Sequence, residues 1–234
     1  MSRETDVSTQ GLRGVGLLQG VPQQRLEALA RECTWRRYDA GQPIISRNAN
    51  DTDVSLVISG RVRVTTYSAA GRQVTFHDDP AGTVLGDLAA VDDGPRCADV
   101  VALDAVLIAS LPAVAFKRLL QQEPLVSERF MRHLTGLVRQ LSERVIELST
   151  QGVQSRVHAE LLRLARMAQV QGNVARIIPA PRHSDIASQV STYREQVTRE
   201  LSALNKAGLL ARDAGSLVIK DLSRLERLVG QGRS

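Results

Sequence analysis

One short stretch of the chain has the residue types and the spacing to bind a small anionic ligand. It is Gly86–Val100, with the sequence GDLAAVDDGPRCADV, in which Asp87 follows a glycine and Arg96 comes nine residues later. Glycine lets a backbone approach a ligand closely. The guanidinium of an arginine matches the geometry of a phosphate, and a carboxylate can accept hydrogen bonds from sugar hydroxyls. The stretch therefore predicts a site for a phosphate and a hydroxyl side by side, as in a ribose phosphate.

The backbone of the same stretch supports this interpretation. The amides of Leu88 and Ala89 would lie at the start of a short helical turn, where unpaired N–H donors bind anions. The alternative is that Asp87 and Arg96 form a purely structural ion pair at the end of a barrel. The residue types alone favour the ion pair, and the full pattern favours the ligand site.

A second set of polar side chains lies in Ser191–Leu210, with the sequence STYREQVTRELSALNKAGLL. Helical periodicity puts Val197, Leu201 and Leu204 on one face. Polar residues lie toward the other face: Arg194, Glu195, Gln196 and Arg199. Arginine binds guanine O6 and N7 with two hydrogen bonds and glutamate accepts from cytosine N4, so this face could read base edges in a major groove. The alternative is an ordinary solvated helix face.

The elements around these stretches indicate where each would be held. From Tyr38 to Leu111, apolar residues alternate with polar ones and glycine turns come at short intervals, which is typical of an antiparallel β-roll or barrel. Leu125–Leu148 is a long helical pattern with nearly three heptads of apolar seam. The seam could pair two chains or pack on the barrel, and its length favours pairing. After residue 150, two helices and a hairpin predict a winged helix-turn-helix.

Charge and cysteine content narrow the classes of function. Residues 1–150 carry 17 Lys and Arg against 18 Asp and Glu, whereas residues 151–234 carry 13 against 7. The whole positive excess lies in the last third, which suggests a nucleic-acid-binding part. The two cysteines, Cys33 and Cys97, form no CxxC motif, and no metal spacing, catalytic triad or phosphate-binding Walker loop is visible. No secretory signal and no membrane span are expected, and neither is enzymatic activity or a bound cofactor; the expected compartment is the cytoplasm.

The pattern Gly-acid-Leu-Ala followed by Gly-Pro-Arg-x-Ala resembles the phosphate-binding cassette of cyclic-nucleotide-binding domains. With Gly41, Ile58–Val62, the long helix and the basic third, residues 15–230 resemble the cyclic-AMP receptor protein and fumarate-nitrate regulator (catabolite activator) family of transcription regulators. The resemblance implies an α+β chain of three parts. These are a cyclic-nucleotide-binding β-roll of the jelly-roll type over residues 1–122, a dimerisation helix over 123–150, and a winged helix-turn-helix domain over 151–234.

The resemblance also implies the residues that bind an allosteric cyclic nucleotide, cAMP or cGMP. From the cassette they are Gly86, Asp87, Leu88, Ala89, Arg96 and Cys97, and from the long helix Leu141 and Ser142. The family usually has Glu at the position of Asp87, and often Ser or Thr at that of Cys97. Leu141 cannot hydrogen-bond where the family's type member has a polar residue that meets adenine, so the choice between cAMP and cGMP stays open.

For DNA, the resemblance implies a homodimer that binds a palindromic TGTGA-like site in double-stranded DNA. Arg194, Glu195 and Arg199 fall on base-reading positions, and Tyr193 and Gln196 near phosphates. The expected dimer interface is Phe130, Leu134, Leu137, Leu141, Val145 and Leu148, and RNA polymerase is a further expected partner. Two other readings stay open: a regulator that binds DNA without nucleotide, and a nucleotide-binding module that acts on a protein partner. A haem site at His77 is not expected, because no second ligand is evident.

Overall fold

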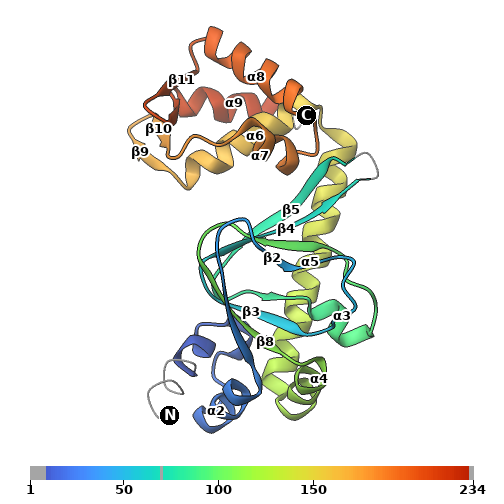
Figure 1. Cartoon of the computed structure of the whole chain (residues 1–234). Helices are drawn as coiled ribbons and strands as arrows, with labels where there is room; N and C mark the ends of the chain where they lie inside the picture. The colour runs from blue at the N-terminus through green and yellow to red at the C-terminus, as the bar shows by residue number, and fades with distance from the viewer. Residues whose placement is uncertain (1–8, 69–70, 232–234) are drawn as a thin grey trace. The chain divides into compact units, whose positions relative to one another are not determined.

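The computed structural model describes residues 9–68 and 71–231, which form two compact units (Figure 1). The first unit contains the β-roll and the first part of the long helix, up to Val138. The second contains residues 139–231 together with 71–75. Each unit has its own hydrophobic core. Among the described residues, no helix is both long enough and apolar enough to cross a membrane.

The β-roll consists of two antiparallel four-stranded sheets, which confirms the predicted fold class. One sheet has the strand order β1–β8–β3–β6 and the other β2–β7–β4–β5. The strands of the first are β1 (Thr34–Tyr38), β8 (Val106–Leu111), β3 (Val54–Ser59) and β6 (Val84–Leu85). Those of the second are β2 (Pro43–Ile45), β7 (Asp99–Ala102), β4 (Arg61–Tyr67) and β5 (Gln73–Pro80).

The tight turn between β3 and β4 depends on Gly60. Its φ is +83°, in the region that only glycine adopts without strain, and a Cβ there would lie 2.4 Å from the carbonyl oxygen of Ala105. Valines and isoleucines of both sheets fill the space between them, with Val57, Val62 and Ile108 fully buried. The alternation that predicted the strands is therefore the alternation between core and surface.

Short helices pack with the roll around a second cluster of apolar side chains. They are η1 (Gly16–Leu18), α2 (Gln23–Glu32), α3 (Asp87–Asp92) and α4 (Ala113–Gln122). Phe116 of α4 is 1% exposed, and its ring contacts that of Phe130 edge-on, with centroids 5.5 Å apart. Trp35 donates its indole N–H to the carbonyl oxygen of Ala30 and so ties β1 to α2.

The long helix α5 (Pro124–Thr150) changes its environment along its length. Val126 and Phe130 are buried in the core of the first unit, and Leu134 packs against that core. This corrects the expectation for Phe130, which is only 6% exposed and serves its own chain rather than an interface. Leu137 is half-buried, while Leu141, Val145 and Leu148 are exposed.

The second unit is a bundle of helices with a small sheet. Its helices are α6 (Val153–Arg166), α7 (His183–Gln189), α8 (Arg194–Lys206) and α9 (Leu222–Gln231). The sheet has the order β11–β12–β10–β9, built from β11 (Leu210–Asp213), β12 (Ser216–Ile219), β10 (Val174–Ile177) and β9 (Gln169–Gln171). The sequence predicted the β11–β12 hairpin and the pair α7–α8, but not α9 or the β9–β10 hairpin that widens the wing.

The turn between α7 and α8 contains a strained backbone position. Ser191 has φ +53°, in the left-handed region that favours glycine. Arg156, 7% exposed, donates from Nε to the carbonyl oxygen of Val190 at 3.0 Å and from Nη1 to that of Gln151 at 2.6 Å. The amide of Thr192 bonds to the carbonyl oxygen of Ala187 at 2.9 Å. These contacts hold the turn and so set the angle at which α8 leaves it.

Candidate nucleotide site and DNA-binding surface

The cassette is built on a left-handed backbone position between β6 and α3. Gly86 has φ +74°, and a Cβ on it would lie 2.1 Å from Nη1 of Arg96. Arg96 can therefore lie directly against the backbone only because residue 86 has no side chain. This close approach was anticipated for a ligand, and in the structure it is made by the arginine of the same cassette.

Arg96 is buried, 4% exposed, and each of its terminal nitrogens has a protein partner. Nη1 donates to the carbonyl oxygen of Gly86 at 3.0 Å, and Nη2 donates to that of Asp53 at 2.8 Å. Nη2 also forms an ion pair with Oδ2 of Asp51 at 2.7 Å. Only Nε has no hydrogen-bond partner among the described residues. No sequence pattern pointed to Asp51, which lies 45 residues away in a loop.

Asp87 does not pair with Arg96, so the structural ion pair considered from the sequence is not formed. Asp87 is 6% exposed, and its Oδ2 lies 3.2 Å from Nε2 of His133 on α5. The two atoms lack the alignment of a regular hydrogen bond, and Oδ2 has no other partner in the part of the chain that is described. The interaction with the Asp87 carboxylate raises the pKa of His133, against burial, which lowers it. His133 is a residue of this site that sequence reasoning missed.

The other expected contacts are divided between the two units. Ala89 is buried beside Asp87, while Leu88 and Cys97 expose their side chains. Leu141 and Ser142 lie on the part of α5 that belongs to the second unit, and both are exposed. The structure therefore brings the cassette residues 86–89 and 96–97 together in the first unit. Residues 141 and 142 belong to the second unit.

Helix α8 presents a polar face and buries an apolar one, as its periodicity predicts. Val197, Leu201 and Leu204 are buried in the core of the second unit. Tyr193, Arg194, Glu195 and Arg199 are exposed and Gln196 is half-buried. The five side chains named from the sequence thus lie at the N-terminal end of a helix whose first turns are accessible, as base reading in a groove requires.

A buried pair anchors α8 to α6. Nε2 of His158 lies 2.6 Å from Oε1 of Glu200, and both side chains are largely buried. Gln154 donates to the same carboxylate oxygen at 3.2 Å. This anchor fixes the rotation of α8 about its axis. It could not be inferred from the sequence, because the two residues are 42 positions apart.

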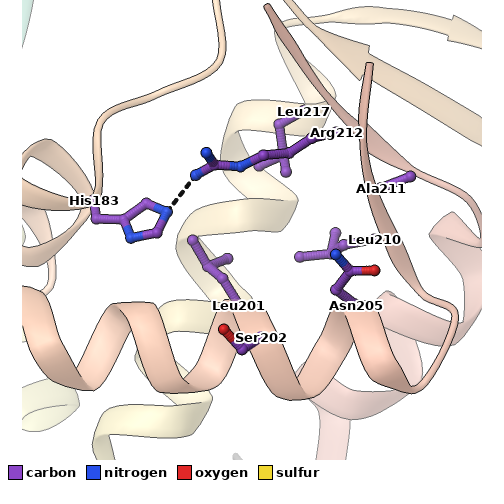
Figure 2. A pocket seen from close by; sticks show the side chains of 8 residues that line it. All are labelled: His183, Leu201, Ser202, Asn205, Leu210, Ala211, Arg212 and Leu217. Carbon is purple, nitrogen blue, oxygen red and sulfur yellow. Dashed lines mark hydrogen bonds between the residues drawn. The ribbon is translucent and has the colours of Figure 1, made fainter.

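A cavity of about 150 Å³ lies between α8 and the wing, lined by His183, Leu201, Ser202, Asn205, Leu210, Ala211, Arg212 and Leu217 (Figure 2). At its mouth Arg212 donates to Nε2 of His183, whose Nδ1 lies 2.7 Å from Oγ1 of Thr198. Since Nε2 accepts, Nδ1 carries the proton in this arrangement. Burial, then the charges of Arg212 and Arg194, lower the pKa of His183, which favours this neutral form.

A second cavity, of about 460 Å³, adjoins the first and is strongly basic. It is lined by Ala180, Pro181, Arg182, His183, Ser184, Arg194 and Arg212. Three arginines and no carboxylate line this cavity. Such a surface attracts the phosphates of a DNA backbone.

Comparison with known proteins identifies a domain in each of two parts of the chain. Residues 35–123 match the family model of the cyclic nucleotide-binding domain, and residues 155–228 match that of the Crp-like helix-turn-helix domain. The chain is 25% identical to a CRP-like cAMP-activated global transcriptional regulator of Mycobacterium tuberculosis, over 92% of this chain and 97% of that protein. It is 26% identical to the cyclic AMP receptor protein of Thermus thermophilus, over 93% and 98%.

Solved structures of the same family have a similar fold. A transcriptional regulator of the crp/fnr family from Eubacterium rectale superposes with a TM-score of 0.76, covering 95% of this chain and 100% of that one at 19% identity. A cyclic nucleotide-binding domain and a Crp-like helix-turn-helix domain thus occur in one chain. The chain belongs to the CRP/FNR family of DNA-binding transcription regulators.

Proposed function

We propose that this chain is a homodimeric transcription regulator that binds a cyclic nucleotide, cAMP or cGMP, as an allosteric effector and a TGTGA-like palindrome as its operator. The observation that carries the proposal is the buried Arg96, seated against Gly86 beside Asp87 in a chain that also presents the polar face of α8. A buried guanidinium and a buried carboxylate in one cassette suit a cyclic phosphate and a ribose hydroxyl of the same ligand. Relatives named as cAMP-activated support the ligand class.

In the proposed complex, the phosphate takes hydrogen bonds from Arg96 and from the amides of Leu88 and Ala89. Asp87 accepts from a ribose hydroxyl, and Cys97 lies beside the phosphate. Leu141 and Ser142 on α5 face the base, and only Ser142 offers a hydrogen bond. A ligand that contacts both the cassette and α5 can favour one arrangement of two such helices over another, which is the differential binding that a population shift needs.

The proposed dimer forms through the exposed stripe of α5. Met131, Val138 and Val145 are spaced seven residues apart, and Leu134, Leu141 and Leu148 each follow three residues later, which is the a/d pattern of a coiled coil. Of these six, only Leu134 also packs on the core of its own chain, and the other five are 40–64% exposed. Leu137, half-buried, lies beside the stripe.

The dimer is tested by sedimentation of the full chain and of a Val145→Glu variant. A glutamate at heptad position a should convert the dimer to a monomer at micromolar concentration. An unpaired charge buried between two helices is strongly unfavourable. Ile146→Glu is the matched control, because Ile146 is 61% exposed but lies off the a/d stripe. Equal association of both variants would exclude this interface.

The proposed DNA contacts are Arg194, Glu195 and Arg199 with base edges and Tyr193 and Gln196 with phosphates. In a dimer, two α8 helices would enter successive major grooves about 34–36 Å apart. The proposed place of action is the cytoplasm, and RNA polymerase is a proposed partner at the promoter. No enzymatic step is part of the proposal.

A second candidate is favoured by one observation: Arg96 and Asp87 already have partners within the chain, Asp51 and His133. A regulator of the same fold could therefore bind DNA without any nucleotide. Isothermal titration with cAMP and with cGMP, followed by anisotropy of a labelled palindrome with and without each, separates the two. Micromolar binding of a nucleotide that tightens DNA binding supports the effector; tight DNA binding with no nucleotide heat supports the second candidate.

The matched variants for this test are Arg96→Ala and Arg61→Ala. Arg61 is an exposed arginine of the same unit, paired with Asp104 at 3.0 Å. Loss of the nucleotide response in Arg96→Ala but not in Arg61→Ala assigns the effect to the cassette. A palindrome that stays unbound at low salt under every condition would contradict the DNA half of the proposal.

A further inference from the structure

His133 links the long helix to Asp87 of the cassette. It lies on α5 one turn after the buried Phe130, its ring 6.3 Å from that of Phe130 between centroids, and Nε2 reaches Oδ2 of Asp87 at 3.2 Å. Asp87 is the carboxylate that a ribose hydroxyl would need, and it is almost fully buried. The imidazole therefore lies at one of the two carboxylate oxygens that a ribose hydroxyl would approach.

The charges around His133 are predominantly negative. Asp87 faces it from α3, and Asp79 of β5 is near enough to raise its pKa further. Asp79 itself contacts Nδ1 of His77 at 2.9 Å. On its own helix, Arg129 is directed to Gly20, and Arg132 is paired with Glu128 and exposed. A protonated His133 is thus attracted by two carboxylates, of which Asp87 is in contact with it. Its release from Asp87 requires a replacement partner for Asp87 or the loss of the proton.

We propose that His133 is a positioning residue that competes with the ribose hydroxyl for Asp87, so that nucleotide binding displaces it and releases a proton. This inference rests on the nucleotide site of the proposed function. It makes the effector response depend on pH, and it gives α5 a contact that is present without nucleotide and absent with it. Asp87 then has two alternative partners, one on the ligand and one on the helix.

The sign of the pH dependence follows from the displacement. In the free chain the contact with Asp87 raises the pKa of His133 above its ordinary value of 6.5. In the complex the imidazole has lost that partner, so its pKa is lower than in the free chain. Binding then releases a proton between the two pKa values, and nucleotide affinity falls as pH falls through that window. If His133 stayed in place and simply attracted the phosphate, affinity would rise instead.

The test is isothermal titration of the full-length protein with the nucleotide that binds it, at pH 6.0 and pH 8.5, in two buffers of different ionisation enthalpy. We expect the Kd of the wild type to be roughly three- to tenfold higher at pH 6.0, since one pKa unit corresponds to a tenfold change. The buffer dependence should show net proton release. His133→Gln should bind with the same Kd at both pH values and release no proton from this site. The control is Arg132→Gln, because Arg132 directly precedes His133 and is exposed. This variant should behave as the wild type.

Each result decides between the proposals. A wild-type Kd that is independent of pH, or lower at pH 6.0, overturns the role of His133 and leaves the nucleotide site standing. No heat with either nucleotide at both pH values overturns the nucleotide site, and the competition with it. An NMR titration of the His133 imidazole in the wild type tests the same inference without relying on a variant that has to fold. His133 should titrate above pH 6.5 in the free protein and at lower pH when the nucleotide is bound, and an unchanged midpoint would also overturn the inference.

Discussion

The cassette and helix α8 both present arginines for an anionic ligand, but they hold them in opposite ways. Arg96 is buried, its charge paired with Asp51 and its terminal N–H groups hydrogen-bonded to two carbonyl oxygens of its own chain. Arg194 and Arg199 are exposed at the start of a helix. In the proposed function, a small ligand would have to replace the internal partners of Arg96, whereas DNA would meet arginines that are already in water. Specificity would then come from competition in the cassette, and from the alignment of accessible groups on α8.

The largest effect is expected at Gly86, where the cassette leaves no space for a side chain. Gly86→Ala adds a Cβ that would lie 2.1 Å from Arg96 and also strains a φ of +74°. We expect a loss of about 2 kcal/mol or more in the free energy of unfolding, measured by urea denaturation, together with loss of nucleotide binding. Gly41→Ala is the control, because its φ is +86° but a Cβ there meets nothing within 4 Å. Equal losses of unfolding free energy in the two variants would show that the clash with Arg96 contributes nothing beyond backbone strain.

On α8, a single exposed arginine should matter to DNA and not to folding. Arg194→Ala should weaken binding to the TGTGA-like palindrome by about 1–3 kcal/mol and reduce discrimination at one base pair, with stability unchanged within about 0.5 kcal/mol. Anisotropy titrations against the palindrome and a scrambled duplex measure both effects. Arg227→Ala, an exposed arginine of α9, is the control. A uniform loss on both duplexes would assign Arg194 to a phosphate instead of a base.

A smaller effect, of opposite sign, is expected when the internal competitor of the phosphate is removed. Asp51→Asn takes away the carboxylate that pairs with Arg96 at 2.7 Å, and its side chain is 55% exposed, so stability should fall by less than about 1 kcal/mol. Nucleotide affinity should rise roughly three- to tenfold, because Arg96 then has one charged partner fewer to exchange. Asp104→Asn, which removes the exposed partner of Arg61, is the control. Weaker binding in Asp51→Asn would mean that Asp51 positions Arg96 for the ligand.

The smallest effect concerns the wing. The pKa of His183 is lowered, so its contribution to stability is present above its ordinary pKa of 6.5 and is lost as pH falls through the lower folded-state value. Protonation removes the acceptor that Nε2 offers to Arg212. Urea denaturation at pH 7.5 and pH 5.5 should show a loss in the wild type that is smaller in His183→Asn. The same loss in both would assign the pH dependence to other groups.

The periodicities of the chain predicted most of its elements, because each records which side of an element faces a core. Alternating valines predicted the roll, and the apolar spacing predicted α5 and α8. Phe130 shows where this reasoning fails. It fits the heptad pattern, but residues 126–134 of α5 pack on the core of the first unit, and periodicity cannot tell a core of the same chain from a partner helix. The β9–β10 hairpin was missed because its strands are short and β9 is fully exposed.

The predictions made from the sequence rested on local residue order. A glycine before an acid, an arginine nine residues on, and a basic face on one helix are properties of neighbouring residues, and they were sufficient to locate the cassette and α8. Only the tertiary structure decided which groups the charged side chains meet. Asp51 is 45 residues from Arg96, and His133 is 46 from Asp87, so no local pattern joins them. The reason is physical: a buried charge takes whichever opposite charge the fold brings within reach, and that choice is made by packing rather than by spacing along the chain.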